Sequence, residues 1–291
     1  MLYLIDASIY VFRAYYSMPD SITDPQGNPV HAVYGFVNFL CDFARRTQAQ
    51  YVGVAFDISL TSSFRNDIYP AYKANREPAP DELKRQFSYC REIAKEMGFP
   101  CFADSTCEAD DIIGTLATKW RNDNTGVTVV TRDKDLLQLV GPDDRYWDFA
   151  NDRTLEYGDV FGEFGVQPEQ IADYLALMGD AVDNIKGVPG IGAKTAAKLL
   201  EAYASLDDIY RHLDDLHKVN VRGAKTLANK LIEHREAAYV AQKLTQIKCD
   251  MPLNADRKEL QRKPPNMPAI ESLFDELGFS DSLRKKTANL A

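Results

Sequence analysis

The sequence lacks the residues from which disulfide frameworks, zinc modules and membrane anchors are built. Its five cysteines are odd in number and show no close paired spacing, which argues against a disulfide framework or a zinc site. No apolar run approaches the length of a membrane span, and the opening stretch MLYLIDASIY is too short and too soon charged for a signal peptide. We therefore expect a soluble, monomeric, cytoplasmic protein with no membrane partner.

The chain also lacks an excess of positive charge. Its 34 Lys and Arg residues against 43 Asp and Glu residues give a net charge of -9, which by itself argues against a nucleic-acid partner. Nine acids, however, stand at positions that suggest one shared site, and these nine alone account for the net charge. The remainder of the chain is balanced, so the bulk charge does not exclude nucleic acid.

Short apolar runs alternate with helical patterns in the first half of the chain. Residues 2–5, 51–56 and 127–131 are typical of strands buried on both faces. Residues 31–47 and 108–120 carry apolar side chains at helical spacing. This alternation predicts an α/β fold with a mostly parallel sheet and helices on both faces.

The second half of the chain reads differently. From about Pro168 the strand patterns stop and short helices punctuated by glycine follow. We therefore expect an α/β domain over residues 1–167, a helical region over 168–255 and a C-terminal extension over 256–291. Within the first, residues 58–90 or so are rich in proline, aromatic and basic residues, which predicts an exposed excursion from the sheet.

Aspartates follow three of the expected strands. Asp6 and Asp57 end the first two, and Asp133 and Asp135 follow the third. Because the carboxyl ends of parallel strands share one edge of a sheet, these side chains are expected to meet there. One aspartate after a strand is more often a helix cap or turn residue, but three separate segments with the same ending favour a common site.

Two further groups of acids stand at helix ends. Glu108, Asp110 and Asp111 crowd a first helical turn, where the dipole favours acids, so an ordinary stabilising start is an alternative. Three acids this close nevertheless repel one another unless a cation lies between them. Asp180 and Asp183 follow the end of another helix, where the dipole disfavours acids.

This set of carboxylates contains no histidine or cysteine. Oxygen ligands alone favour Mg²⁺ or Mn²⁺ over zinc. The carboxylates outnumber what one Mg²⁺ uses, which indicates two ions, roughly 3.5–4 Å apart in enzymes that use such pairs. The expected reaction is phosphodiester hydrolysis.

Residues 187–198, GVPGIGAKTAAK, have the form of a helix–hairpin–helix. Gly190 and Gly192 allow a tight turn whose amide groups face outward at a helix N-terminus, and Lys194 and Lys198 follow one turn apart. Such a hairpin binds the DNA backbone without reading sequence. A plain interhelical turn is the alternative for any glycine-rich turn of this kind.

These segments resemble the 5′-nuclease and flap endonuclease family, which includes the 5′-3′ exonuclease domain of bacterial DNA polymerase I and free-standing bacterial and phage homologues. The similarity spans about residues 2–253 and rests on the strings LIDASIYVFRAYY, HAVYGF, VAFD, FRNDIYPAYKANR, EADDIIGTLA, VVTRDKDLLQL and DYLALMGDAVDNIKGVPGIGAKTAAKLL. It implies a PIN-like α/β domain with a helical arch over the excursion and a helix–three-turn–helix DNA-binding region. It also implies a two-metal, structure-dependent 5′-nuclease of DNA replication and repair that leaves 5′-phosphates.

The resemblance distributes the acids between two Mg²⁺ or Mn²⁺ ions. The first ion is expected to use Asp6, Asp57, Glu108, Asp110 and Asp111, and the second Asp133, Asp135, Asp180 and Asp183. Related hairpins hold a potassium ion through turn carbonyls, which makes Val188 and Ile191 its candidate ligands by resemblance only. The implied partners are DNA with a 5′ flap, nick or free 5′ end, and replication or repair proteins.

The arch string carries the remaining candidates. By family likeness, Lys73 and Arg76 meet the scissile phosphate and offset its developing charge, and Tyr72 stacks on a frayed base. Arg65 and, on the first helix, Arg13 are expected to contact DNA. For the arch string, composition alone favours a solvated basic loop. For Arg13, the alternative is a salt bridge to the acids.

Other functions stay open at this point. The same fold could serve a non-catalytic protein that binds DNA structures, a small-molecule phosphatase built on residues 133–135, or a PIN-like ribonuclease. The intact acidic positions disfavour the first, and the hairpin disfavours the second, because a small substrate needs no duplex platform. Since no polymerase sequence follows residue 291, we also expect a free-standing nuclease.

Overall fold

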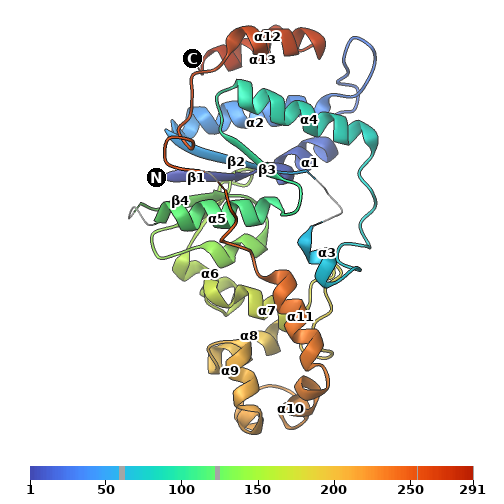
Figure 1. Ribbon diagram of the computed structural model, residues 1–291, viewed down its shortest axis with the longest axis vertical. Coiled ribbons are helices and arrows are strands. Elements are labelled where there is room, and N and C mark those ends of the chain that lie inside the picture. Colours follow the sequence, from blue (N-terminus) through green and yellow to red (C-terminus); the bar gives the residue numbers. More distant parts are fainter. Residues whose placement is uncertain (59–62, 122–124, 254, 291) are drawn as a thin grey trace.

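The computed structural model describes residues 1–58, 63–121, 125–253 and 255–290. Residues 59–62, which belong to the predicted excursion, lie outside the described residues. The molecule is elongated: an α/β unit lies at one end and a group of short helices at the other, as Figure 1 shows. In the part that the structure describes, no helix is long and apolar enough to cross a membrane.

One six-stranded sheet forms the centre of the α/β unit, with the strand order β3-β2-β1-β4-β5-β6. Its strands are β1 (Leu2–Asp6), β2 (Tyr51–Asp57), β3 (Cys101–Asp104), β4 (Val127–Val130), β5 (Arg145–Asp148) and β6 (Arg153–Glu156). All neighbouring pairs are parallel except β5 and β6, which run antiparallel. The predicted mostly parallel sheet is therefore confirmed, and the strand order reverses at β1, between β2 and β4.

Helices cover both faces of the sheet. The helices of the α/β unit are α1 (Ala7–Ser17), α2 (His31–Thr47), α3 (Phe64–Ile68), α4 (Asp81–Glu96), α5 (Ala109–Arg121), η1 (Lys134–Leu139) and α6 (Tyr157–Phe164). Along β1, Leu2 and Leu4 pack beneath α5, whereas Ile5 packs with α1, α2 and α4 on the other face. Alternate side chains of one buried strand thus enter two separate cores.

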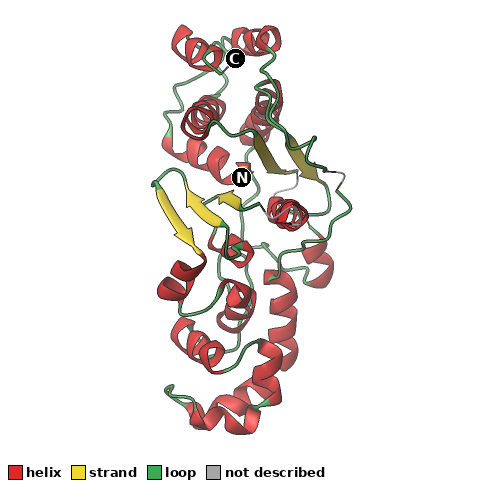
Figure 2. Ribbon diagram, turned by 90° about the vertical axis from the view of Figure 1, so that its left-hand side faces the viewer, coloured by secondary structure: helices red, strands yellow, loops and turns green. Residues whose placement is uncertain are grey.

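The helical region packs around an apolar core that extends to Tyr146, Leu155 and Val160 of the α/β unit. Figure 2 shows the arrangement of its helices from the side. Its helices are η2 (Pro168–Gln170), α7 (Ile171–Met178), α8 (Ala193–Ala202), α9 (Leu206–Arg211), η3 (Leu213–Lys218), α10 (Ala224–Glu233) and α11 (Arg235–Thr245). After α11 the chain returns to the α/β unit, where the amides of Ile247 and Met251 donate to Gln138 at 2.9 Å and Thr115 at 3.2 Å. Two crossings of the chain therefore join the two parts.

The C-terminal extension ends in α12 (Met267–Glu276) and α13 (Asp281–Ala288). Their apolar side chains, among them Ile270 and Phe274, are buried in the same core as α2 and α4. The extension therefore covers the outer side of the α/β unit, far from the helical region in Figure 1.

The excursion from the sheet is shorter than the sequence predicted. Residues 81–96 form α4, whose Leu83, Phe87 and Cys90 are buried in the core beside α2. Because polar residues stand between these apolar ones, the sequence pattern did not reveal the apolar face of this helix. Among the described residues of the predicted excursion, the segment that holds α3 and residues 69–80 lies away from the sheet (Figure 1). We call residues 69–76 the arch foot.

Candidate functional site

The carboxyl edge of the sheet gathers the predicted aspartates. Asp6 ends β1, between the ends of β2 and β4, and only 3% of its surface is exposed. Its Oδ2 accepts a hydrogen bond from the Thr131 hydroxyl at 3.0 Å. Asp57 Oδ1 accepts from the Ala109 amide at 2.8 Å, at the start of α5. The strand ends and the first turn of α5 therefore form one acidic rim.

The rim carboxylates raise one another's pKa. Burial, followed by the charges of Asp57 and Asp133, raises the pKa of Asp6 to about 8. Burial and the charges of Asp133 and Asp6 raise the pKa of Asp110 well above its ordinary value. Burial and the charges of Asp133 and Asp180 do the same for Asp135. Acids from five separate segments thus lie close enough to repel one another.

The arch foot brings cations to this rim. Lys73 Nζ lies 2.8 Å from Glu108 Oε2 and 3.9 Å from Asp183 Oδ2, and Arg76 pairs with Asp183 as well. Burial alone would raise the pKa of Glu108, but the charges of Lys73 and Arg65 hold it below its usual value. The arch foot therefore neutralises one side of the acidic rim.

Backbone contacts fasten the arch foot to the loop after α7. The Lys73 amide donates to the Asp183 carbonyl at 3.0 Å, and the Asn184 side chain donates to the Ala71 carbonyl at 2.7 Å. Lys73 has a φ of 56°, in the left-handed region that non-glycine residues rarely adopt. Such strain persists only where surrounding contacts hold it and is common at functional sites.

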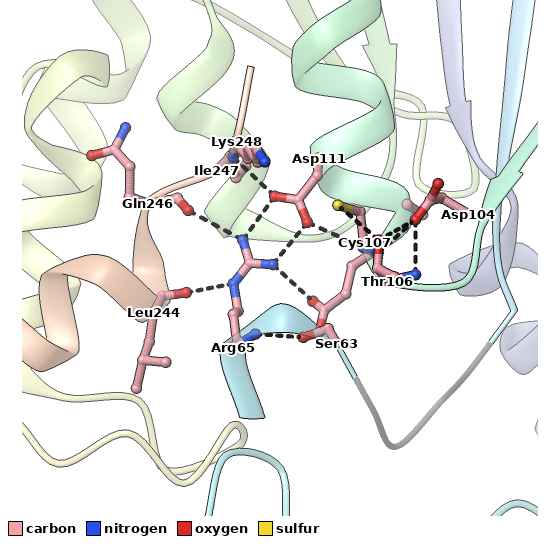
Figure 3. A network of polar contacts seen from close by, with 12 residues as sticks. Ser63, Arg65, Asp104, Thr106, Cys107, Asp111, Leu244, Gln246, Ile247 and Lys248 are labelled. Carbon is pink, nitrogen blue, oxygen red and sulfur yellow. Dashed lines mark hydrogen bonds and ion pairs between the residues drawn. The ribbon is translucent and has the colours of Figure 1, made fainter. Parts of the chain in front are cut away.

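Burial and pairing of the side chains argue against three of the predicted roles. Tyr72 is 4% exposed, packs with Ala176 and Leu244, and donates its hydroxyl toward Glu108 and Asp183 at 3.2 Å, so it presents no face on which a base could stack. Arg65 is 2% exposed, which argues against a contact with DNA, and Asp111, fully buried, is paired with Arg65 (Figure 3). Because the partners that bury these side chains are far away in the sequence, the sequence pattern could not indicate their burial.

The rim acids other than Asp111 have the chemistry of ligands for divalent cations, although their side chains are not grouped as a ligand set. Among the described residues, no three His, Cys, Asp or Glu side chains are grouped so that they could hold a metal ion. Lys73 and Lys134, which lies 3.1 Å from Asp180, already neutralise part of the rim. Asp135 Oδ1, however, is buried without a hydrogen-bond partner, as expected of an oxygen kept for a cation. All the donors are oxygens, which suits Mg²⁺ or Mn²⁺.

The glycine hairpin lies between α7 and α8. Gly190 has a φ of 81°, in the left-handed region, and Val188 and Ile191 anchor the turn with 2% and 3% of their surfaces exposed. The amides of Gly190 and Gly192 donate to no residue within the described ranges. These amides are available to an anion at the start of α8.

One basic residue at this hairpin escaped the sequence prediction. A Cβ on Gly190 would lie 2.6 Å from Lys230 Nζ, so the ammonium of this α10 residue rests against the turn. Lys230 has no ion pair with any residue that the structure describes, whereas Lys198 pairs with Glu201 at 2.5 Å. The string GAKT occurs at residues 192–195 in the hairpin and again at 223–226, where α10 begins. This repeat could have indicated that α10 belongs with the hairpin.

The other basic candidates stay exposed. Arg13 lies on the surface of α1, and it forms no ion pair with a rim acid in the described part of the chain. Lys194 is exposed in the first turn of α8. Both are free to meet a phosphate, and the predicted DNA contacts of these residues stay predictions.

The raised pKa values predict how stability depends on pH without metal. The pKa of Asp6 rises from its ordinary 3.8 to about 8 on folding, and burial raises those of Asp110 and Asp135 as well. Between pH 3.8 and about pH 8 the folded chain therefore binds more protons than the unfolded chain. Its stability falls as the pH rises through this range.

We expect the melting temperature in EDTA to be lower at pH 8 than at pH 6, and Mn²⁺ to reduce the difference because a cation favours the ionised acids. Circular dichroism melts of the full chain measure both. Asp6→Asn should weaken the pH dependence, whereas the matched change at exposed Asp143 should leave it intact. A melting temperature that climbs with pH in EDTA would contradict the assignment.

Fold and site together define a class of protein. Acids gathered at the carboxyl edge of a parallel sheet, with cations facing them, are the kind of site that a metal-dependent hydrolase of the α/β class needs. Residues 1–165 match the family model of the N-terminal, resolvase-like domain of 5′-3′ exonucleases, and residues 166–268 match the model of their C-terminal SAM fold. The chain belongs to the 5′-3′ exonuclease family, which confirms the predicted family.

Individual relatives agree with this assignment. DNA polymerase I of Rhizobium leguminosarum is 36% identical over 98% of this chain, which spans only 28% of that relative's length. The 5′-3′ exonuclease of Buchnera aphidicola subsp. Baizongia pistaciae is 36% identical over 93% of this chain and 89% of its own. The structure of bacteriophage T5 flap endonuclease with DNA and metal ions has a TM-score of 0.68 at 22% identity and covers 99% of this chain and 97% of that one, which supports the fold.

Proposed function

We propose that this chain hydrolyses DNA phosphodiesters at free 5′ ends, nicks and flap junctions during replication and repair, with two Mg²⁺ or Mn²⁺ ions, and leaves 5′-phosphate products. The observation that carries the proposal is the convergence of acids from separate segments on one edge of the sheet, beside a cationic arch foot. The phage relative was crystallised with DNA and metal ions, which supports the same ligands here. Potassium at the carbonyls of Val188 and Ile191 stays a prediction.

Each part of the site has a role in this reaction. The acids of the rim other than Asp111 would hold the cations, which supply an activated water and stabilise the charge on the phosphate. Lys73 and Arg76, which pair with Glu108 and Asp183, place positive charge where the scissile phosphate would enter. Gly190, Gly192, Lys194 and Lys198 would hold the duplex backbone without reading its sequence.

Cleavage of end-labelled substrates tests the proposal. Flap, nicked and blunt DNA duplexes are incubated with the chain in Mg²⁺, in Mn²⁺ and in EDTA, and a matched RNA flap is included. We expect metal-dependent cuts at the 5′ end or the junction, with fragments that carry 5′-phosphates. Tight binding without cleavage in either metal would favour a non-catalytic DNA-binding protein, and preferential cleavage of RNA would favour a ribonuclease.

Lys230 provides a separate test of the hairpin. Lys230→Ala is expected to weaken binding of a duplex about threefold to tenfold at low salt and to lower the salt dependence by about one counterion, because one phosphate contact is lost. Fluorescence anisotropy in Ca²⁺ at several salt concentrations measures both. Lys285→Ala removes an exposed lysine of α13 and serves as the control. An unchanged salt dependence would mean that Lys230 does not touch DNA.

A further inference from the structure

A buried ion pair lies beside the acidic rim and not in it. Arg65 of α3 and Asp111 of α5 are 2% and 0% exposed. Arg65 Nη1 lies 2.8 Å from Asp111 Oδ2, and Arg65 Nη2 lies 2.9 Å from Asp111 Oδ1. This two-pronged arrangement, drawn in Figure 3, is the strongest that the two side chains can form.

The carboxylate of Asp111 has no oxygen to spare. Besides the two bonds from Arg65, its Oδ1 accepts from the Lys248 amide at 2.9 Å and its Oδ2 from the Glu108 amide at 3.1 Å. A carboxylate offers about four lone-pair positions, and four donors occupy them. On the same rim, by contrast, Asp135 Oδ1 is buried and accepts no hydrogen bond.

The guanidinium of Arg65 is equally committed. Its Nε donates to the Leu244 carbonyl at 2.8 Å and its Nη2 to the Gln246 carbonyl at 3.1 Å (Figure 3). The pair therefore joins three segments: α3 next to the arch foot, the first turn of α5, and the end of α11 where the chain returns from the helical region. Lys73 follows the first of these segments and Glu108 opens the second, and their side chains meet at 2.8 Å.

We propose that Arg65 and Asp111 are positioning residues that set the arch foot against the acidic rim, and that Asp111 binds no cation. The inference rests on the proposed function, because it concerns the same reaction. Arg65 fixes α3 relative to α5, and this fixes the separation of Lys73 from Glu108 and Asp110. Small displacements of such groups are costly to a reaction that depends on aligned charges.

Metal binding separates a ligand from a positioning residue. Titration of the full chain with Mn²⁺, followed by the electron paramagnetic resonance of the free ion, compares Asp111→Asn with Asp110→Asn. We expect D110N to weaken Mn²⁺ binding about tenfold or more and D111N to keep the affinity of the unaltered chain. An equal loss in both variants overturns the proposal. If the unaltered chain binds no Mn²⁺, the proposed function fails, and the positioning role is judged on the stability cycle below.

A stability cycle keeps the proposal testable if D111N folds poorly. Unfolding free energies of Arg65→Gln, D111N and the double variant are measured by urea titration at the temperature where all are folded. Because each single change leaves a buried partner unpaired, the double variant should be little less stable than the worse single one. Additive losses would show that the two side chains act independently and would overturn the pairing.

Kinetics distinguish positioning from DNA contact. At a temperature where R65Q is folded, we expect kcat for a flap duplex to fall about tenfold to a hundredfold, while KM stays unchanged. Arg65→Lys should recover little, because an ammonium cannot make the two-pronged contact. A raised KM with unchanged kcat would return Arg65 to the DNA-binding set that the sequence predicted and overturn the positioning role.

Discussion

Replacing Asp135 with asparagine is expected to slow cleavage of a 5′-flap duplex by about a thousandfold or more while duplex binding persists. Asp135 Oδ1 is buried and has no hydrogen-bond partner, so it is the rim oxygen that gains most from a cation. Single-turnover cleavage with excess enzyme measures the chemical step, and anisotropy measures binding. Turnover close to that of the unaltered chain would remove Asp135 from the catalytic centre.

The same substitution carries an internal check on folding. Burial and the charges of Asp133 and Asp180 raise the pKa of Asp135 well above its ordinary value, so its ionised form opposes folding at neutral pH. In EDTA at pH 8, D135N should therefore melt higher than the unaltered chain although it is inactive. Asp143→Asn, on the exposed surface, should change neither property. A variant that is both inactive and less stable would point to misfolding.

Removal of the Lys73 ammonium is expected to have the second-largest effect. Lys73→Met keeps the length of the side chain but removes the charge that lies 2.8 Å from Glu108 Oε2 and 3.9 Å from Asp183 Oδ2. We expect kcat to fall about a hundredfold to a thousandfold, because the loss of one preorganised charge costs this much in comparable sites. Single-turnover rates at saturating DNA measure it.

The control for K73M comes from the neighbouring helix. Lys84→Met removes an α4 lysine whose partner, Asp81, is almost fully exposed, and such surface pairs contribute little. K84M should cleave at the normal rate. If K73M retains full kcat and only binds DNA more weakly, Lys73 serves in docking and not in the chemical step.

The parts of the fold that the sequence predicted are those with a strong local pattern. β1, β2 and β4 are short apolar runs that end in or just before an aspartate, and α2 has the predicted bounds, 31–47. β5 and β6 were not predicted because each has only four residues and begins and ends with a charged one. Helix α12 was missed because its neighbours in sequence are polar, although it packs in the main core.

The candidate site shows a similar division. The ends of parallel strands meet whatever the side chains are, so the aspartates after β1, β2 and β4 could be placed together from the sequence. The sequence could not separate Asp110 from Asp111, since successive residues of a helix point about 100° apart and only one of them can face the rim. The partner of Asp111 is Arg65, 46 residues away, and no local pattern records that contact.

The two crossings of the chain between the α/β unit and the helical region have a mechanical consequence. A single linker would allow rotation, but the crossing after α11 is bonded to Thr115, Gln138 and Asp111 along its length. These hydrogen bonds fasten the end of the helical region to the α/β unit and oppose its rotation. If the hairpin binds the duplex as proposed, we expect the number of base pairs between the hairpin and the cleaved bond to depend on the dimensions of the protein and not on the length of the flap.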